Sequence, residues 1–395
     1  DEFGMEPPTI IDDLAEENAE MEAFAEERVE RYIKGRRQVL MDGLNDFVEA
    51  MDPQRIMVVT GESGLGKSAL LSKFYRDYAR SHPGDLFIPC FIGASTGSTD
   101  IRRLLFRCCK IIFNVCGFEV EKQQRLENIT GVNDDARKQI ESIEKEYEIT
   151  RNSQDLKNKF HVFLKKAASS RRVVLLFDGL NQLDATSGAH SMEWLPRVLP
   201  DNVRVILSSL DHPILDLLRR EPERIREMRL APLNEADSRN IISEFLHHYR
   251  KQMTHDQVNL LMEKPARGNP LYLRIVLDEL RTLNVYEEIN HRIQVLPGDV
   301  RSLFLWVLKE RLSNDPGFRD QEGRPNGKEL VRRFSASLGV SRYGLSQQEL
   351  TELIEPGDPL GNVAALQRLI RPYLMQRGEL LDFFHAQLRQ AVEDE

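Results

Sequence analysis

The sequence contains no apolar run close to the about 20 residues that a helix needs to span a bilayer. Its beginning lacks a basic segment followed by an apolar core, so no secretory signal is evident. No internal repeat of about 20–50 residues is visible either. These absences argue against a membrane protein and against a repeat array, and they favour a cytoplasmic location.

Cysteine is scarce, and the four that occur lie close together in the sequence at Cys90, Cys108, Cys109 and Cys116. No CxxC pair is present, and the usual spacings of zinc ligands are absent. We therefore interpret the cysteines as buried thiols in a reducing compartment and not as metal ligands.

Positive charge is also in deficit, because 54 Lys and Arg face 63 Asp and Glu, for a net charge of −9. Duplex binding depends on clustered Lys and Arg, so we do not expect nucleic acid to be a partner. Hydrophobic residues at 41% and charged residues at 30% are typical of a globular protein. The length of 395 residues predicts two or three domains.

The most informative segment that is present spans residues 61–68, Gly-Glu-Ser-Gly-Leu-Gly-Lys-Ser, after the apolar run 55–60 and before a helical stretch. Strand, glycine turn and helix are the context in which GxxxxGK[ST] predicts a polyphosphate site. The glycines let backbone N–H groups turn toward the phosphates, Lys67 adds a charge, and the Ser68 hydroxyl is a Mg²⁺ ligand. The helix points its N-terminus at the same anion. The nucleotide contacts predicted here are Gly61, Glu62, Ser63, Gly64, Leu65, Gly66, Lys67, Ser68 and Ala69.

Four more apolar runs predict buried strands, and helical stretches separate them; the runs are 86–92, 172–177, 203–208 and 227–230. Continuous apolar strands alternating with helices indicate an α/β fold with a parallel sheet. We interpret the polar stretch 119–166 mainly as a solvated helical hairpin, with a partner-binding surface as the alternative. The acidic stretch 10–33 is a solvated leader helix or the stem of a missing N-terminal module.

These patterns divide the chain into four parts. The first is a leader or stem over 1–31, and its residues 1–4 look like a cloning remnant. The second is an NTPase domain over 32–232, which contains the insertion 119–166. A helical domain over 233–315 and a last domain over 316–395 follow. The last domain starts with a turn-rich linker and ends in an apparent β-hairpin. That order of elements suggests a winged-helix domain.

Three further positions carry candidate chemistry. Asp178 ends the strand-like run 172–177, where phosphate-loop proteins place the carboxylate that holds the Mg²⁺ shell. A hydrolytic enzyme needs a base shortly after it, but Asn181 and Gln182 stand there, and Asp184 is the next carboxylate. Slow turnover is the expected consequence. Ser208, at the end of the run 203–208, either senses the γ-phosphate or caps the following turn together with its neighbour.

Taken together, these motifs resemble the STAND class of signal-transduction NTPases, from about Tyr32 to the C-terminus. Within that class the likeness is to NACHT-type and nephrocystin/telomerase-associated-protein-like members. The segments that carry the likeness are 56–68, 178–183, 208–209, 230–233, 268–273 and 383–385.

The resemblance implies roles for further residues. Ile33 and Arg36 would line the adenine pocket, Pro270 would pack on the adenine, and His385 would reach the β-phosphate of ADP and latch a closed state. The alternatives are purely structural roles: a turn at 33–36, a proline in the first turn of a helix at 270, and a histidine at a domain interface at 385. NACHT members usually carry acidic residues where Asn181 and Gln182 stand here, so efficient hydrolysis is not expected.

The function expected from this resemblance is an ATP/ADP-binding switch with Mg²⁺ that self-associates in its ATP form and acts through effector and sensor modules absent from this sequence. The alternatives are a DNA-binding initiator ATPase and a ring-forming remodelling ATPase. An initiator predicts a basic C-terminal domain, whereas residues 323–395 hold nine Lys or Arg and ten Asp or Glu. A remodelling enzyme predicts a clear carboxylate base after Asp178.

Overall fold

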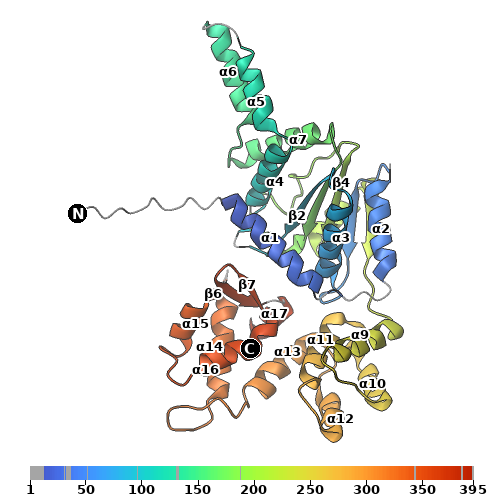
Figure 1. Ribbon diagram of the computed structural model, residues 1–395, viewed down its shortest axis with the longest axis vertical. Helices are drawn as coiled ribbons and strands as arrows, with labels where there is room; N and C mark the ends of the chain where they lie inside the picture. Colours follow the sequence, from blue (N-terminus) through green and yellow to red (C-terminus); the bar gives the residue numbers. More distant parts are fainter. Residues whose placement is uncertain are drawn as a thin grey trace, which may run out of the picture. The chain divides into compact units, whose positions relative to one another are not determined.

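The computed structural model describes residues 13–30, 32, 37–50, 52–95, 97–129, 133–186, 188–341, 344–383 and 386–393. They form two compact units (Figure 1). The first unit holds the described residues up to 32 together with 37–62 and 67–230, and the second holds 63–66 and the residues from 231 onward. In this described part of the chain, no helix is both long and apolar enough to cross a bilayer.

The first unit is built on a parallel sheet of five strands in the order β2-β3-β4-β1-β5. The strands are β1 (Ile56–Thr60), β2 (Leu86–Phe91), β3 (Val173–Asp178), β4 (Val203–Ser208) and β5 (Ile225–Arg229). β1, β3 and β4 are buried along their whole length, which is why their sequences are continuously apolar and do not alternate. The predicted α/β fold with a parallel sheet is confirmed.

Helices cover both faces of this sheet. Residues an odd number of positions apart on a strand point to opposite faces. On β2, Phe87 packs against Tyr75 of α3 with ring centroids 5.0 Å apart, whereas Cys90 meets Cys108 of α4. The helices of the first unit are α1 (Asp13–Glu30), α2 (Gln38–Glu49), α3 (Lys67–Ser81), α4 (Ile101–Val115), α5 (Phe118–Glu127), α6 (Asp134–Tyr147), α7 (Ser153–Ala168) and α8 (Pro213–Arg219).

Helix α1 corrects the expectation of a solvated leader. Its Met21 and Ala25 are 1% and 0% exposed, so one stripe of the helix is fully buried. Glu22 accepts hydrogen bonds from Tyr75 and from Arg76, both on α3. The sequence did not signal this packing, because acidic residues are as numerous as apolar ones along α1 and polar contacts supply part of the attachment.

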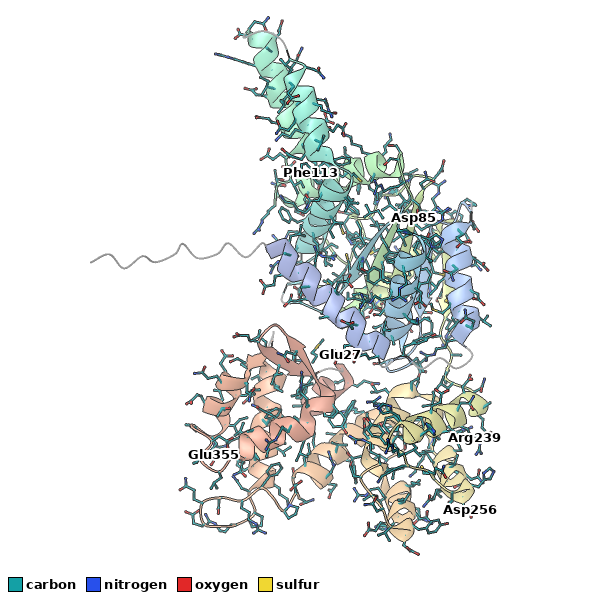
Figure 2. All side chains as sticks on the ribbon, in the orientation of Figure 1. Glu27, Asp85, Phe113, Arg239, Asp256 and Glu355 are labelled. Atoms are coloured by element: carbon teal, nitrogen blue, oxygen red, sulfur yellow. The ribbon has the colours of Figure 1, made fainter. Side chains whose placement is uncertain are left out.

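The stretch 119–166 is only in part the solvated hairpin that the sequence predicts. Helices α5 and α6 pair as that hairpin and extend away from the sheet (Figure 1). At its base, Phe113 packs against Phe118 and Tyr147 with ring centroids 6.2 and 6.4 Å apart (Figure 2). Helix α7 is different, because it packs on α4 and buries Phe160 and Leu164 completely. For α7 the prediction is wrong, and its apolar residues at helical spacing were the available signal.

The second unit is mainly helical. Its helices are α9 (Glu235–His248), α10 (His255–Met262), α11 (Pro270–Leu280), α12 (Tyr286–Val295), α13 (Val300–Trp306), which continues as a π-helical segment (Val307–Leu312), α14 (Gly327–Val340), α15 (Gln347–Ile354), α16 (Asn362–Ile370) and α17 (Ala386–Glu393). The helical pattern that the sequence predicts after the sheet is present.

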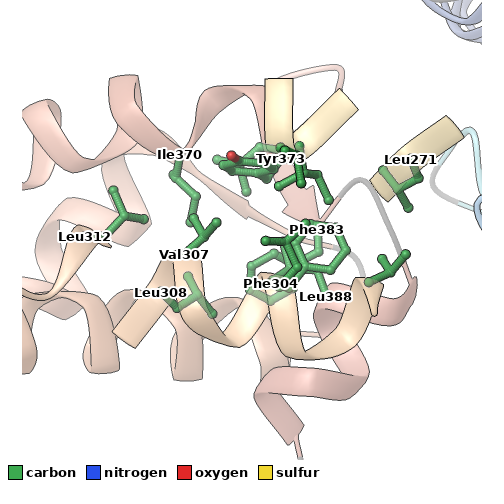
Figure 3. Packing of buried hydrophobic residues seen from close by; sticks show 14 of the residues in the cluster. Leu271, Phe304, Val307, Leu308, Leu312, Ile370, Tyr373, Phe383 and Leu388 are labelled. Atoms are coloured by element: carbon green, nitrogen blue, oxygen red, sulfur yellow. The ribbon is translucent and has the colours of Figure 1, made fainter. Parts of the chain in front are cut away.

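A small antiparallel sheet completes the second unit, in the order β6-β8-β7. Its strands are β6 (Leu345–Ser346), β7 (Leu374–Arg377) and β8 (Leu380–Phe383). The last two form the hairpin that the sequence predicts. One continuous apolar core joins the helices to this sheet, and within it the rings of Phe304 and Tyr373 meet edge to face at 6.0 Å (Figure 3).

Candidate functional site

The glycine-rich loop lies between β1 and α3, as its motif predicts. Gly61, Gly64 and Gly66 have φ angles of 146°, 83° and 85°, a region of backbone space that side chains with a Cβ rarely adopt. Among the described residues, the amides of Ser63, Gly64 and Gly66 donate to no other group. Several unsatisfied N–H donors at the start of a helix form an anion cradle, so this segment fits a polyphosphate.

Lys67 and Ser68 are the first two residues of α3, and Ala69 follows them. The Lys67 ammonium donates to the carbonyl oxygens of Gly61 and Glu62 at 2.6 and 3.1 Å. Burial lowers the pKa of Lys67, and the carboxylates of Asp178 and Glu62 oppose this shift. A phosphate oxygen is a stronger acceptor for a half-buried ammonium than a carbonyl, so the side chain is placed to exchange these contacts for a nucleotide.

Asp178 and Ser208 end the neighbouring strands β3 and β4, and their side chains meet there. The Ser208 hydroxyl donates to the Asp178 carboxylate and accepts from the Gly179 N–H at 2.9 Å. Asp178 is only 3% exposed. Ser208 therefore fixes the orientation of the carboxylate, a contact that a sequence pattern does not reveal.

The carboxylate of Asp178 and the hydroxyl of Ser68 fit Mg²⁺. A carboxylate and a hydroxyl are ligands that Mg²⁺ prefers, and the ion usually takes its remaining positions from water and phosphate oxygens. The described residues contain no group of three or more His, Cys, Asp or Glu that could hold a metal unaided. Asp178 and Ser68 would hold Mg²⁺ when a nucleotide is bound, and the ion would neutralise developing phosphate charge.

The segment after β3 carries the other candidates for catalysis. The Asn181 side-chain oxygen accepts from the Leu210 N–H at 3.1 Å, which ties it to the loop after β4. Asp184 accepts from the Thr99 hydroxyl at 3.0 Å, and its own N–H donates to the Thr99 carbonyl at 2.9 Å. Thr99 lies in the loop after β2, and sequence reasoning gave no sign of it. Thr99 thus contacts Asp184 through both its hydroxyl and its carbonyl.

The sequence left two roles open for Ser208 and its neighbour Ser209, namely sensing the γ-phosphate and capping the following turn. In the described structure the Ser208 hydroxyl bonds to Asp178 and Gly179 and not to the following turn, and the next helix, α8, is capped by His212, whose ring nitrogen accepts from the Ile214 N–H at 3.3 Å. The neighbouring Ser209 hydroxyl is buried and has no hydrogen-bond partner among the described residues. A buried hydroxyl without a partner beside the loop is consistent with a ligand-sensing position.

Pro270 is the first residue of α11, which is where a helix tolerates proline. Asn269 caps this helix, and its side-chain amide also donates to the Ser63 carbonyl at 3.1 Å. The Leu271 N–H points to the Gly64 carbonyl at 3.4 Å. Asn269 was not among the predicted site residues, although Asn before Pro is a recognisable helix start.

Three predicted contacts lie outside the described residues, namely Ile33, Arg36 and His385. Their roles stay predictions. The residues that the structure brings together in the first unit are Gly61, Glu62, Lys67, Ser68, Asp178 and Ser208, at the carboxyl ends of the adjacent strands β1, β4 and β3.

Residues 34–207 match the family model of the AAA ATPase domain. This part of the chain is therefore a P-loop ATPase domain, which implies the use of nucleotide and usually of Mg²⁺. The match covers β1, β2, β3 and most of β4, and it does not distinguish the STAND class that the sequence resembles.

Curated relatives are similar over most of this chain. A TPR repeat-containing protein of Dictyostelium discoideum is 27% identical over 367 residues, 88% of this chain and 21% of the relative. Nephrocystin-3 of Homo sapiens is 24% identical over 411 residues, 99% of this chain and 27% of the relative. Telomerase protein component 1 of Mus musculus is 24% identical over 309 residues, 76% of this chain and 10% of the relative. The chain spans about a quarter or less of the length of these relatives.

Two solved structures are similar to this chain over most of its length. The Walker-type ATPase of Pyrococcus abyssi is 14% identical, with a TM-score of 0.43 and coverage of 90% of this chain and 95% of that chain. The replication initiator DnaA bound to AMPPCP and single-stranded DNA is 12% identical, with a TM-score of 0.38 and coverage of 87% and 91%. Likeness at this level carries no argument about function, so the expectation that nucleic acid is not a partner stays a prediction.

Proposed function

We propose that this chain is the core of a nucleotide-operated switch of the STAND and NACHT kind. It binds ATP or ADP with Mg²⁺, hydrolyses ATP slowly, and couples the bound nucleotide to self-association and to effector signalling in a reducing cytoplasm. The observation that carries the proposal is the pairing of a well-formed phosphate loop with a weak hydrolytic apparatus.

The weakness lies directly after Asp178. Asn181 and Gln182 are amides, which orient water but accept its proton poorly. The Asn181 oxygen is already engaged by the Leu210 N–H, and Asp184 is held by Thr99. A site that binds a nucleotide but turns it over slowly keeps its state long enough to act as a switch.

The second unit supports the same interpretation. The order α14, β6, α15, α16, β7, β8 is the order of a winged-helix domain. His385, just after β8 in the sequence, is the residue expected to contact the β-phosphate of ADP. The large relatives include proteins named for TPR repeats, which suits a chain whose sensor and effector modules lie elsewhere in a longer protein.

The main alternative is a DNA-binding initiator, and α16 argues against it. This helix is the one that a winged-helix domain would place in a DNA groove. Its Val363, Leu366 and Ile370 are completely buried, and Arg368 is the only residue of this helix that is exposed. A groove-reading helix needs several exposed polar side chains, which α16 does not offer.

The test is to identify the nucleotide that the purified protein retains, by denaturing it and separating the released nucleotide by ion-exchange chromatography. We expect retained ADP and a turnover of about one per minute or less, against the about 10 per second that is typical of enzymes. Turnover above about one per second would favour a remodelling ATPase. Salt-dependent binding of a labelled DNA duplex would favour an initiator.

A further inference from the structure

Two buried cysteines of the first unit are in contact with each other. Cys90 is on β2 and Cys108 is on α4, and their sulfur atoms are 3.7 Å apart. Both residues are 0% exposed. A disulfide requires sulfur atoms about 2.05 Å apart, so these two sulfur atoms must approach each other by about 1.6 Å to form the bond.

A buried guanidinium lies beside this pair. Arg107 is 3% exposed, and one of its terminal nitrogens is 3.6 Å from the Cys90 sulfur and 2.6 Å from the Pro89 carbonyl oxygen. Its Nε donates to the Asn18 side-chain oxygen at 2.9 Å. All of these partners are uncharged. A buried cation with neutral partners favours the anionic form of any acid next to it, and that acid is the Cys90 thiol.

The two thiols are polarised in opposite directions. The hydrogen bond from Cys108 and the charge of Arg107 hold the pKa of Cys90 below its ordinary value, although burial acts against them. The same hydrogen bond and burial raise the pKa of Cys108. Such a pair has one sulfur suited to attack and one that keeps its proton until the second step.

The position of the pair explains how a small oxidant could reach it. β2 is an edge strand of the sheet, and its Pro89 has no N–H to offer at that edge. Helix α1 contacts the same edge, where the Phe91 N–H points to the Met21 sulfur at 3.3 Å. Release of α1 would remove Asn18 from Arg107 and uncover the edge beside Cys90.

We propose that Cys90 and Cys108 are a thiol pair that a hydroperoxide oxidises to a disulfide when α1 is released. The Cys90 thiolate attacks one peroxide oxygen, the O–O bond breaks, and the departing hydroxide takes a proton to become water. The Cys108 sulfur then attacks the Cys90 sulfenic sulfur. The S–O bond breaks, and the second hydroxide leaves as water with the proton of Cys108. Two thiols and one hydrogen peroxide thus give one disulfide and two water molecules.

The other two cysteines serve as internal controls. Cys109 is next to Cys108 on α4, but burial raises its pKa to about 12. Cys116 is half-buried, and burial raises its pKa as well. In the described part of the chain, neither forms a hydrogen bond with another cysteine or with a guanidinium, so neither should react in the same way.

The direct test treats the native protein with hydrogen peroxide, blocks remaining thiols with N-ethylmaleimide, and maps peptides by mass spectrometry without reductant. We expect a Cys90–Cys108 link and a fall from four free thiols to two. The link closes a loop of about 19 residues, which should raise the Tm of the oxidised protein by about 5–10 °C, reversibly with dithiothreitol. Four intact thiols in the folded protein, or a link between other cysteines, would overturn the proposal.

Variants separate the pair from general oxidation. Cys109→Ala should keep both the link and the Tm shift, whereas Cys108→Ala should lose both. Glu22→Gln, which weakens the attachment of α1 to α3, should speed the reaction severalfold, while Glu30→Gln at the end of α1 should not. Equal rates in these two variants would remove α1 from the proposal. If Cys108→Ala does not fold, the peptide map of the unaltered chain still decides the identity of the pair.

Discussion

Two buried carboxylates, one in each unit, show how the same exposure can serve different purposes. Asp178 in the first unit and Glu279 in the second are both 3% exposed. The described partner of Asp178 is the uncharged hydroxyl of Ser208. Glu279 instead pairs with Arg311 at 3.0 Å and accepts from the Tyr373 hydroxyl at 3.4 Å.

The difference lies in what each carboxylate still has to offer. The Asp178 charge has no cation within ion-pair distance in the described structure, so it is available to a metal ion. Both oxygens of Glu279 are engaged, one by a guanidinium and one by a phenol, and these two partners come from two segments distant from α11 in the sequence. We infer that Asp178 belongs to a binding site, whereas Glu279 fastens α11, the π-helical segment and the β7 region to one another.

The largest effect is expected from removing the carboxylate of Glu279 from its pair with Arg311. Glu279→Ala leaves Arg311 partly buried without its partner, and removing one member of a buried pair costs about 3–5 kcal/mol. Because Arg311 is 26% exposed, we expect the lower end of that range. Denaturant unfolding measures the loss, and Glu279→Gln, which keeps the shape and some hydrogen bonding, is the control. A loss below about 1 kcal/mol in the alanine variant would rank this pair with ordinary surface ion pairs.

Lys67→Ala alters the nucleotide site to which we assign Asp178, and it should affect nucleotide binding instead of stability. Removing the ammonium that faces the phosphates should weaken ATP and ADP by at least about 100-fold, or about 2.7 kcal/mol, while the unfolding midpoint stays nearly unchanged. Calorimetric titration of both nucleotides checks this. Lys73→Ala is the matched control on the same helix, because Lys73 pairs with Asp77 and lies outside the loop. Unchanged affinity in a folded Lys67→Ala protein would contradict the phosphate-loop assignment.

A smaller effect is expected at Asp184, whose carboxylate is oriented by Thr99. Asp184→Asn should reduce the slow ATP turnover severalfold, since an amide cannot accept a proton from water. Thr99→Val should reduce it less, because the carboxylate remains but loses its hydroxyl partner. A phosphate-release assay under single-turnover conditions measures both. If Asp184→Asn turns over as fast as the unaltered chain, Asp184 has only a structural role in tying two loops together.

The same comparison shows which parts of the site could be predicted from the sequence. The phosphate loop and Asp178 were predictable because each is a local pattern, a glycine turn after a strand and a carboxylate at a strand end. The contacts of Ser208 with Asp178 and of Thr99 with Asp184 were not, since they join residues 30 and 85 positions apart. Such pairs depend on strand order, which a single sequence does not give.

The fold shows a similar division. All five strands of the large sheet were predicted, and for β1 to β4 the apolar runs report burial directly. The burial expected for β5 is wrong, because this edge strand exposes three of its five residues. The packing of α1 was missed, since polar contacts to Tyr75 and Arg76 contribute to it beside a narrow apolar stripe. The Cys90–Cys108 contact was also hidden, because it requires knowing that α4 lies on the face of β2 that Cys90 points to.

The smallest expected effect is a pH dependence of the free energy of unfolding that comes from Glu279. Burial raises the pKa of Glu279 above its ordinary value of 4.5, while the charges of Arg311 and Arg292 oppose the shift. The folded state therefore binds this proton more tightly than the unfolded state does. Its contribution to stability is greatest below the ordinary pKa and is lost as pH rises through the raised pKa.

Glu279→Gln should remove that dependence, so the stability of the unaltered chain relative to this variant should rise on acidification from about pH 7 toward pH 5. Glu329→Gln is the control, because Arg332 and Arg333 lower the pKa of Glu329 to about 2, and its contribution changes only as pH falls through lower values. Denaturant unfolding at several pH values in constant salt measures both differences. If the difference between the unaltered chain and Glu279→Gln does not change with pH, Arg311 balances the burial of Glu279 completely, and the carboxylate titrates as it would in water.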